Sequence, residues 1–563
     1  MTDWSVHPDA LALLESARSA PTDTLARHIL ADWLADNGQR GLASLLRLSL
    51  RMPGQIHHVS KNQSRTLPGV FHAVNGWLLG SNGALQAREL TKQPWVNGLH
   101  LSGRGLSPLA QNDLLKALPS NWSPGWQVLS LADFTIPAEG FLTTLQKDWT
   151  RHITHMRLGG PFASSAVLAA ITRASTPLET LELRSDWWRQ DKIAGRSMNG
   201  RPNFPPPLEI DSTAPPLPTS VRSISLENLT LTEGALNGLL ETVASACTRH
   251  LRLNQCHFSA HGLAIFNQSS IWSSLESLNL TGCRLPKPHP GKNDKPLMPI
   301  ANNRLRSITL RACSLTGNSL EALARCGWLS GPTRIDLSQN HLSQLDAREL
   351  EGNLDYQAVE SLNLSGCGID GEKLGYWLAL GPWDRLGQLN VSCNPLGERG
   401  WRHLATDEFT PALISLDASS TLVTLQALEN FANGSLFPKL ARLSLRGKSP
   451  DPKMVWPESI RTLLGHPAIA GLSRIRFDAP EDWIQQEMAS PECLLSAPAK
   501  EELLKLAETR LRETSRRKAE EKLNQQLMMS MGEHTGIYAR WAARQRASRQ
   551  TSDPTGAPGE PGS

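Results

Sequence analysis

Several features that mark specialised protein classes are scarce or absent in this 563-residue chain. Eight cysteines are too few for a scaffold held together by disulfides. The sequence has no uninterrupted apolar run of about 18 residues, which is the length that a membrane-spanning helix needs. Its amino-terminal residues also lack a cationic stretch followed by an apolar one, so no secretory signal is predicted. We therefore expect a cytoplasmic protein that has no membrane partner.

A strong charge of either sign is also missing. Lys and Arg total 57, against 53 Asp and Glu, which gives a formal net charge of +4. Because a dedicated nucleic-acid-binding protein usually carries a larger basic excess, nucleic acid is not the expected partner. The hydrophobic share of 40% and the charged share of 20% are those of a soluble globular protein, and the length allows several domains.

The chain does contain many copies of one pattern, Leu-x-x-Leu-x-Leu-x-x-(Cys or Asn)-x-Leu. Clear copies cover Leu275–Leu285, Leu305–Leu315, Val359–Ile369 and Leu386–Leu396. The last apolar residue of each Leu-x-Leu falls at positions 101, 131, 158, 183, 226, 253, 280, 310, 337, 364, 391, 418, 445 and 477, most often 27 residues apart. The alternation predicts short strands with one buried face. Segments between them, such as 236–243 and 319–325, have helical spacing.

This pattern resembles the leucine-rich repeat family, and its long period resembles the ribonuclease-inhibitor type. The resemblance covers about residues 95–480. It implies an α/β solenoid, a leucine-rich-repeat horseshoe with a parallel sheet of about 14 strands on the concave face and helices outside. One strand and one helix cannot close a core alone, so the repeats must stack. Longer gaps predict insertions at 184–220 and 286–303, which we interpret as surface loops.

The flanking segments differ from the repeats. Residues 1–52 are predicted to be helical, and the sequence Ala31-Asp32-Trp33-Leu34 resembles the repeat-companion domain that precedes repeat arrays in some bacterial proteins. The alternative is an amino-terminal cap that seals the apolar edge of the first repeat. Residues 53–94 are predicted to be a connecting or capping segment between this domain and the solenoid.

The carboxy-terminal part is polar and favours helix. We predict a helical, basic extension over 481–547 and a disordered tail over 548–563. Ten Lys or Arg and four Glu between positions 510 and 549 give this segment a net charge of 10 − 4 = +6. It is either a solvated helix or a surface for nucleic acid or an acidic partner.

One position of the repeat alternates between cysteine and asparagine. A small polar side chain there can bond to the backbone where each strand turns, which keeps buried amides paired. The interchange of the two residue types favours a structural role over a metal site or a nucleophile. The structural repeat positions are Cys256, Cys283, Cys313, Asn340, Cys367 and Asn394.

Candidate partner-binding residues lie in two places. Small polar residues dominate the middle of the predicted concave face, and arginines gather toward its carboxyl end at Arg442, Arg446, Arg474 and Arg476. Trp187 and Trp188 form an aromatic pair beside the proline-rich insertion, and paired aromatics of this kind can anchor an interface. Other tryptophans recur shortly before the strands and are predicted to fill the repeat core.

These observations predict a non-enzymatic scaffold that binds another protein through its repeat surface. The sequence shows no catalytic or metal-ligand motif, and we expect no cofactor and no metal. Two alternatives remain open. The first is an effector-type protein whose repeats direct a catalytic activity, and the second is nucleic-acid association through the basic carboxy-terminal helix.

Overall fold

The computed structural model of the protein describes most of the repeat region and parts of both flanks. The described residues are 7–19, 25–38, 43, 46–47, 54–57, 96–102, 107–121, 127–132, 134–145, 148–174, 176–184, 207–208, 218, 220–231, 233–245, 248–257, 259–283, 285, 300, 304–381, 383–405, 412–423, 439–447, 460–461, 463–477 and 481–534. The predicted contact residues Trp187 and Trp188 and the predicted tail over 548–563 lie outside them.

The chain divides into two compact units, Met1–Leu440 and Ala441–Ser563. The last two predicted repeat strands belong to the second unit.

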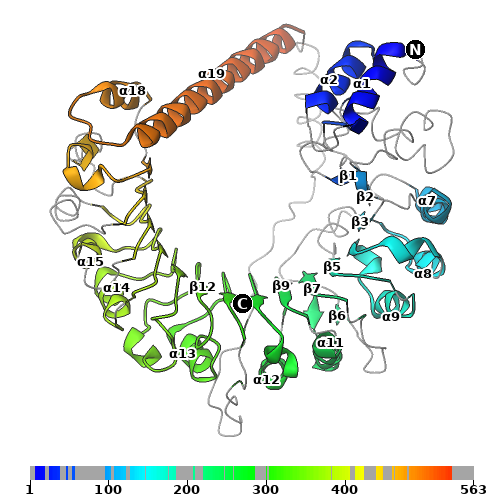
Figure 1. Cartoon of the computed structure of the whole chain (residues 1–563), viewed down its shortest axis with the longest axis horizontal. Helices are drawn as coiled ribbons and strands as arrows, with labels where there is room; N and C mark the ends of the chain where they lie inside the picture. Colours follow the sequence, from blue (N-terminus) through cyan, green and yellow to red (C-terminus); the bar gives the residue numbers. More distant parts are fainter. Residues whose placement is uncertain are drawn as a thin grey trace, which may run out of the picture. The chain divides into compact units, whose positions relative to one another are not determined.

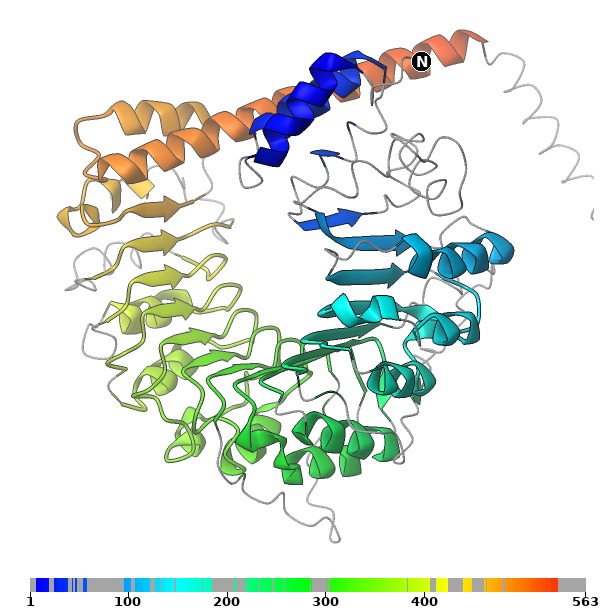
Figure 2. The same cartoon turned by 45° about the vertical axis from the view of Figure 1, so that its right-hand side comes forward.

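The first unit contains one parallel sheet, in which neighbouring strands follow the order of the chain. Its thirteen described strands are β1 (Gly54–His57), β2 (Val96–Ser102), β3 (Val128–Ala132), β4 (His155–Gly159), β5 (Thr180–Arg184), β7 (Ser223–Glu227), β9 (His250–Asn254), β10 (Ser277–Asn279), β11 (Ser307–Thr309), β12 (Arg334–Asp336), β13 (Ser361–Asn363), β14 (Gln388–Asn390) and β15 (Ser415–Asp417). The strands lie side by side and point the same way (Figure 2).

Helices follow the strands and lie on the outer side of this sheet (Figure 1). They are α7 (Pro108–Asn121), α8 (Glu139–Leu145), η3 (Asp148–His152), η4 (Gly160–Phe162), α9 (Ser165–Arg173), α11 (Glu233–Ser245), α12 (Ala260–Gln268), η5 (Ser270–Ser273), α13 (Gly317–Arg325), η6 (Ala347–Leu350), α14 (Gly371–Leu378) and α15 (Gly397–Leu404). The repeating strand–helix unit and the parallel sheet define an α/β solenoid of the leucine-rich-repeat type, as the sequence predicts.

The register of the sheet explains the period of the sequence. Leu278 pairs with Ile308 and then Ile335, and the ladder continues through Leu362 and Leu389. All five side chains are buried. Because successive strand residues point to opposite faces, the leucines of each strand fill the core between sheet and helices, and the intervening residues face the other way. Fourteen strands of the chain, β2 to β17 without β6 and β8, end beside the fourteen marks of the sequence pattern.

The recurring tryptophans belong to this core, as predicted. Trp149, Trp272 and Trp383 are buried, and each indole N–H donates to a carbonyl near the end of the preceding helix, at 2.8, 3.0 and 3.2 Å. Each ring therefore fills the return from helix to strand and also bonds to a carbonyl in the last turns of the helix.

Two features were not predicted. Strand β1 lies in the predicted connecting or capping segment, and it pairs with β2. In the first insertion, β6 (Pro207–Leu208) pairs with β8 (Thr230–Leu231) to form a separate two-stranded sheet. At least these residues of the insertion are therefore tied to the repeat that follows it.

Helices flank the repeats in both units. The first unit begins with α1 (Pro8–Ser19) and α2 (Leu25–Asp36), which pack on each other. The second unit contains β16 (Arg442–Ser444), η7 (Pro467–Ile469), β17 (Arg474–Arg476), α18 (Glu481–Ala489) and the 38-residue helix α19 (Ala497–His534). Helix α19 packs on β17 and α18.

Candidate functional site

The exposed face of the first unit's sheet presents rows of side chains in register. On the ten strands β4, β5, β7 and β9 to β15, one row contains the residue between the two buried apolar residues. The equivalent residue of β3, Ser130, is buried. The members of the row are Arg157, Glu182, Ser225, Arg252, Asn279, Thr309, Asp336, Asn363, Asn390 and Asp417. None of them is fully buried, so this face offers a regular array of polar groups at about 4.8 Å per strand.

Asn and Asp side chains in this row have a structural role that the sequence pattern did not reveal. The Oδ1 atoms of Asn279, Asp336, Asn363, Asn390 and Asp417 each accept the backbone N–H two residues further on, at 2.9 to 3.1 Å. This is the side-chain bond of an Asx turn. It closes the strand and fixes the side chain that forms the exposed face.

The turn that follows has the same backbone conformation in eight repeats of the described structure. The residue three positions after the row member has a positive φ between 52° and 71° in eight successive repeats, at Asn228, Gln255, Gly282, Ala312, Gln339, Gly366, Cys393 and Ser420. Only two of these eight residues are glycine. The other six adopt a conformation that disfavours L-residues, because the ladder bonds on both sides hold the turn.

The Cys or Asn position follows directly and lies in the core. The Sγ atoms of Cys283 and Cys313 donate to the carbonyls of Leu253 and Leu280, both at 2.8 Å. Cys367 donates to Leu337 O at 3.1 Å, and Cys256 to Leu226 O at 3.6 Å. Each thiol therefore bonds to the backbone of an earlier repeat.

Asparagine at this position makes more bonds than cysteine. Asn340 donates to Leu310 O and Leu337 O, both at 2.7 Å, and accepts from the N–H groups of Cys313 and Leu315 at 3.0 and 3.1 Å. Asn394, two repeats further along the chain, makes the equivalent set of contacts. An asparagine repeat thus satisfies backbone groups of the cysteine repeat before it.

Burial keeps the thiols of Cys283, Cys313 and Cys367 protonated. Desolvation raises the pKa of Cys313 to about 12 and that of Cys367 to about 11. A thiol is a nucleophile or metal ligand only as the thiolate, so these side chains lack the chemistry of a reactive site. Across the described part of the chain, no three His, Cys, Asp or Glu side chains lie together in a way that could hold a metal ion.

Besides the predicted carboxy-terminal arginines, charged side chains also lie on the exposed sheet face of the amino-terminal repeats. Arg157 of β4 pairs with Glu182 of β5 at 3.2 Å, and Arg184 of β5 pairs with Glu227 of β7 at 3.6 Å. The aligned repeats contained this signal, since the arginine and the acidic residue occupy equivalent positions in neighbouring repeats.

The four predicted carboxy-terminal arginines lie in the second unit. Arg474 and Arg476 both contact the carboxylate of Glu502 on α19. Arg442 and Arg446 lie on and beside β16 and are exposed. The helix that follows the repeats therefore engages half of the predicted cluster.

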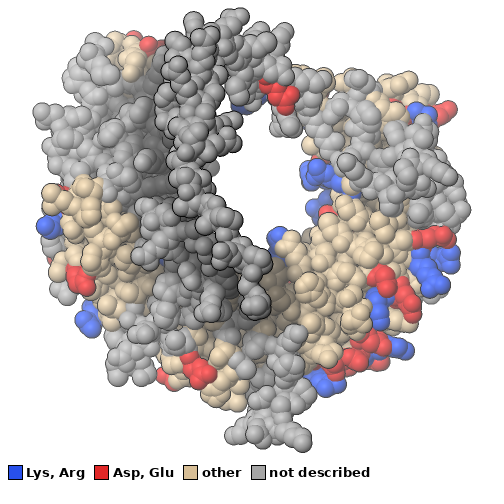
Figure 3. Space-filling view, turned by 180° about the vertical axis from the view of Figure 1, so that it is seen from behind, with Lys and Arg blue, Asp and Glu red and all other residues tan. Residues whose placement is uncertain are grey.

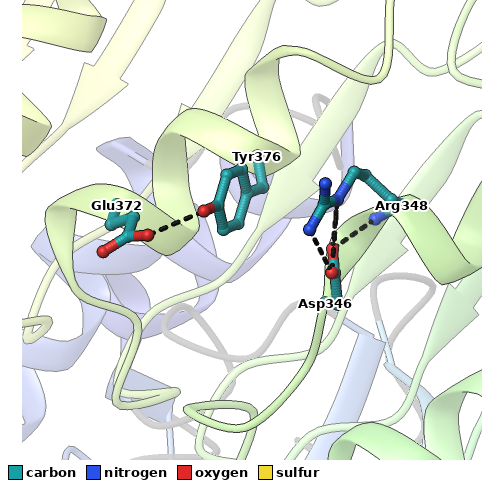
Figure 4. Close-up of polar contacts among 4 residues, drawn as sticks. All are labelled: Asp346, Arg348, Glu372 and Tyr376. Atoms are coloured by element: carbon teal, nitrogen blue, oxygen red, sulfur yellow. Dashed lines mark hydrogen bonds and ion pairs between the residues drawn. The ribbon is translucent and has the colours of Figure 1, made fainter.

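A polar cluster also joins two repeats on the helical side (Figure 4). Arg348 of η6 donates to Asp346, with Nη2 at 2.6 Å from Oδ2, and its guanidinium lies 5.0 Å from the ring centre of Tyr376 on α14. The Tyr376 hydroxyl donates to Glu372 at 2.7 Å. The bond from Arg348 lowers the pKa of Asp346, and the bond to Glu372 raises the pKa of Tyr376.

Basic and acidic side chains lie next to one another at several places on the face seen in Figure 3. Within the described ranges, no helix is long and apolar enough to cross a membrane.

Comparison with known proteins identifies no family. No protein-family model matches the chain, and no curated protein matches it. Among solved structures, one chain of the yeast Rad7–Elc1 complex is 18% identical, with 74% of this chain and 93% of that chain covered and a TM-score of 0.34.

Proposed function

We propose that the protein is a non-enzymatic scaffold that binds another protein through the exposed face of its parallel sheet. One observation carries this proposal: a single in-register row runs over ten strands, from Arg157 to Asp417, with no member fully buried. Side chains on this face can vary while the leucines on the other face keep the core intact.

The amino-terminal part of the row has the chemistry of a contact surface. The side chains of Arg157 and Glu182 are 50% and 43% exposed, and Arg252 is exposed with no side-chain partner in the described structure. Arginine is enriched among residues that dominate binding energy at protein interfaces. A partner that offers carboxylates to Arg252 and Arg157 would fit this region.

Other predicted contacts are retained as parts of the same proposal. Arg442 and Arg446 are candidate contacts in the second unit. Trp187 and Trp188 are candidate contacts in the first unit. The amino-terminal helices serve as a companion domain or cap for the repeats. The pairing of Arg474 and Arg476 with Glu502 supports a role for these two side chains in docking α19.

Charge reversal on the sheet face tests the proposal. The variant Arg157→Glu/Arg252→Glu changes two exposed residues three strands apart on one row. The control Arg173→Glu/Arg399→Glu makes the same charge change on the outer helices α9 and α15, where both arginines are exposed. All three proteins are used as bait in lysate of the native cell, and thermal unfolding checks that they fold alike.

We expect the wild type and the control to capture the same partner and the sheet variant to lose it. Equal capture by the sheet variant would refute the assignment of this face. Loss in the control as well would mean that capture depends on overall charge.

A further inference from the structure

A basic groove lies where strands β11 to β13 of the first unit begin. It encloses about 660 Å³, and its walls include Arg304, Arg306, Arg334, Arg385 and Glu360. The lining therefore includes four arginines and one glutamate. The groove is at the edge of the sheet where the strands begin, not at an outermost strand. It lies beside the row of polar residues that carries the proposed function.

The repeat explains why this edge is hollow. Arg304, Gly331 and Arg385 occupy one position of the 27-residue period, and Arg306, Thr333 and Glu360 occupy another. Backbone bonds from Thr333 N to Arg306 O and from Glu360 N to Thr333 O place these residues on successive strands. The small residues of the middle repeat leave space between the long side chains on either side.

The arginines are poorly neutralised. Within the described residues, the side chains of Arg304, Arg306 and Arg334 are exposed and have no hydrogen bond or ion pair. Arg385 and Glu360 form one long ion pair of 4.0 Å, with both side chains largely exposed. Like charges held close together repel, and an anionic ligand relieves that repulsion. The groove therefore complements a group that carries several negative charges.

An apolar side chain continues the same edge. Ile414 is 43% exposed and occupies the repeat position of Glu360, two strands further along. Gly387 lies between them, and its N–H donates to Glu360 O, while Ile414 N donates to Gly387 O. From Arg306 to Ile414 the edge crosses four strand spacings, or roughly 19 Å at 4.8 Å each. An extended peptide of about six residues spans that length.

We propose that this edge binds an extended acidic segment of a partner protein, with carboxylates in the arginine groove and an apolar residue against Ile414. The guanidinium groups match carboxylates in charge and in donor geometry. The proposal goes beyond the scaffold function, because it concerns a different surface and names the chemistry of the segment. Either site can fail while the other holds.

Fluorescence anisotropy with the full-length protein tests the assignment. The probe is a labelled peptide of four glutamates followed by glycine and leucine, and the comparison peptide has glutamine at each glutamate. The groove variant is Arg306→Glu/Arg334→Glu, and the control is again Arg173→Glu/Arg399→Glu. We expect the wild type and the control to bind the acidic peptide alike, and the groove variant to bind it at least about tenfold more weakly.

Three further readouts sharpen the result. Added salt should weaken binding, the glutamine peptide should bind far more weakly, and Ile414→Ser should cost about threefold for the leucine-containing probe. Arg157→Glu/Arg252→Glu should leave peptide binding within about twofold of the wild type, which separates this groove from the sheet face.

Equal peptide binding by the groove variant and the wild type would overturn the proposal. Displacement of the peptide by equimolar inorganic phosphate would show a simple anion site instead. Tighter binding of a single-stranded DNA oligonucleotide, lost in the groove variant, would reassign the groove to nucleic acid.

Discussion

The amino-terminal and central repeats of the first unit belong to the same sheet but differ in strand length and in the side-chain contacts at the strands. Strands β3, β4, β5, β7 and β9 have five residues each, and ion pairs such as Arg157–Glu182 join side chains across them. Strands β10 to β15 have three residues each, and in five of these six an Asn or Asp side chain closes the strand. The exception is β11, which has Thr309 in that place.

This difference shows how one face can serve both structure and recognition. In the central repeats most side chains of the polar row bond to the backbone of their own turns. This role restricts these positions mainly to Asn and Asp. In the amino-terminal repeats the same row is not needed for the turn, and long charged side chains occupy it. We therefore expect substitutions in the central row to affect stability and substitutions in the amino-terminal row to affect binding.

The largest effect should come from the aromatic cluster where the two regions meet. Trp328 is fully buried, contacts Phe266 and Trp272 with ring centres 5.7 and 5.0 Å away, and donates its indole N–H to Asn267 at 2.8 Å. Trp328→Ala should lower the free energy of unfolding by about 4 kcal/mol. Chemical denaturation measures the loss.

Trp328→Phe serves as the control for that experiment, because it keeps most of the packing and removes the hydrogen bond. It should cost distinctly less than the alanine variant. A loss below about 1 kcal/mol for Trp328→Ala would mean that this cluster does not join the two regions.

Replacement of the buried Asn340 should cause the next largest loss of unfolding free energy. Asn340→Ala removes four backbone contacts in the core and leaves donors and acceptors of two repeats unpaired, so it should cost about 3 kcal/mol. Asn363→Ala, on the exposed row, removes one bond at 3.1 Å and should cost about 1 kcal/mol. Urea unfolding compares the two. Equal losses would remove the distinction between the buried position and the exposed row.

Substitutions in the repeated left-handed turn should change the stability less, and Gly366→Ala and Ala312→Gly should act in opposite directions. Gly366→Ala adds a methyl group that meets nothing closer than 3.8 Å, so its cost of about 1 kcal/mol comes from the backbone at φ 64°. Ala312→Gly relieves the same conformation at φ 54° and should be neutral or stabilising by about 0.5 kcal/mol. Differential scanning calorimetry should show the melting temperature falling in the first variant only.

The exposed ion pair should contribute least. A double-mutant cycle on Arg157 and Glu182 should give a coupling of about 0.5 kcal/mol that shrinks in 0.5 M salt, because both side chains are about half exposed. A coupling above about 2 kcal/mol would show that this row also holds the sheet together and would erase the contrast between the two regions.

The sequence predicted the strands well, because a buried leucine ladder requires strict spacing. Leu280, Leu310 and Leu337 lie in equivalent buried places, as their spacing predicts. The left-handed turn was missed because its position holds residues as different as Ala312 and Gly366. Neighbouring ladder bonds impose that conformation, so no single residue type marks it.

Other features depend on contacts that the pattern does not encode. Glu502 contacts Arg474 and Arg476 only because α19 packs on β17. The basic groove needs Gly331 and Thr333 to lie between longer side chains. That arrangement is visible in the sequence only when the repeats are aligned position by position and the small residues are compared with their neighbours.

The central claim is that successive repeats stack in register and display one row of side chains on a rigid sheet. Spin labels at Ser223 and Gln388 test it directly, since six strand pairings connect these two positions along one row. Pulsed electron paramagnetic resonance should give a single narrow distance of roughly 25–30 Å, as six spacings of about 4.8 Å on a curved sheet require. A broad distribution, or a distance well beyond 40 Å, would contradict the stacked ladder.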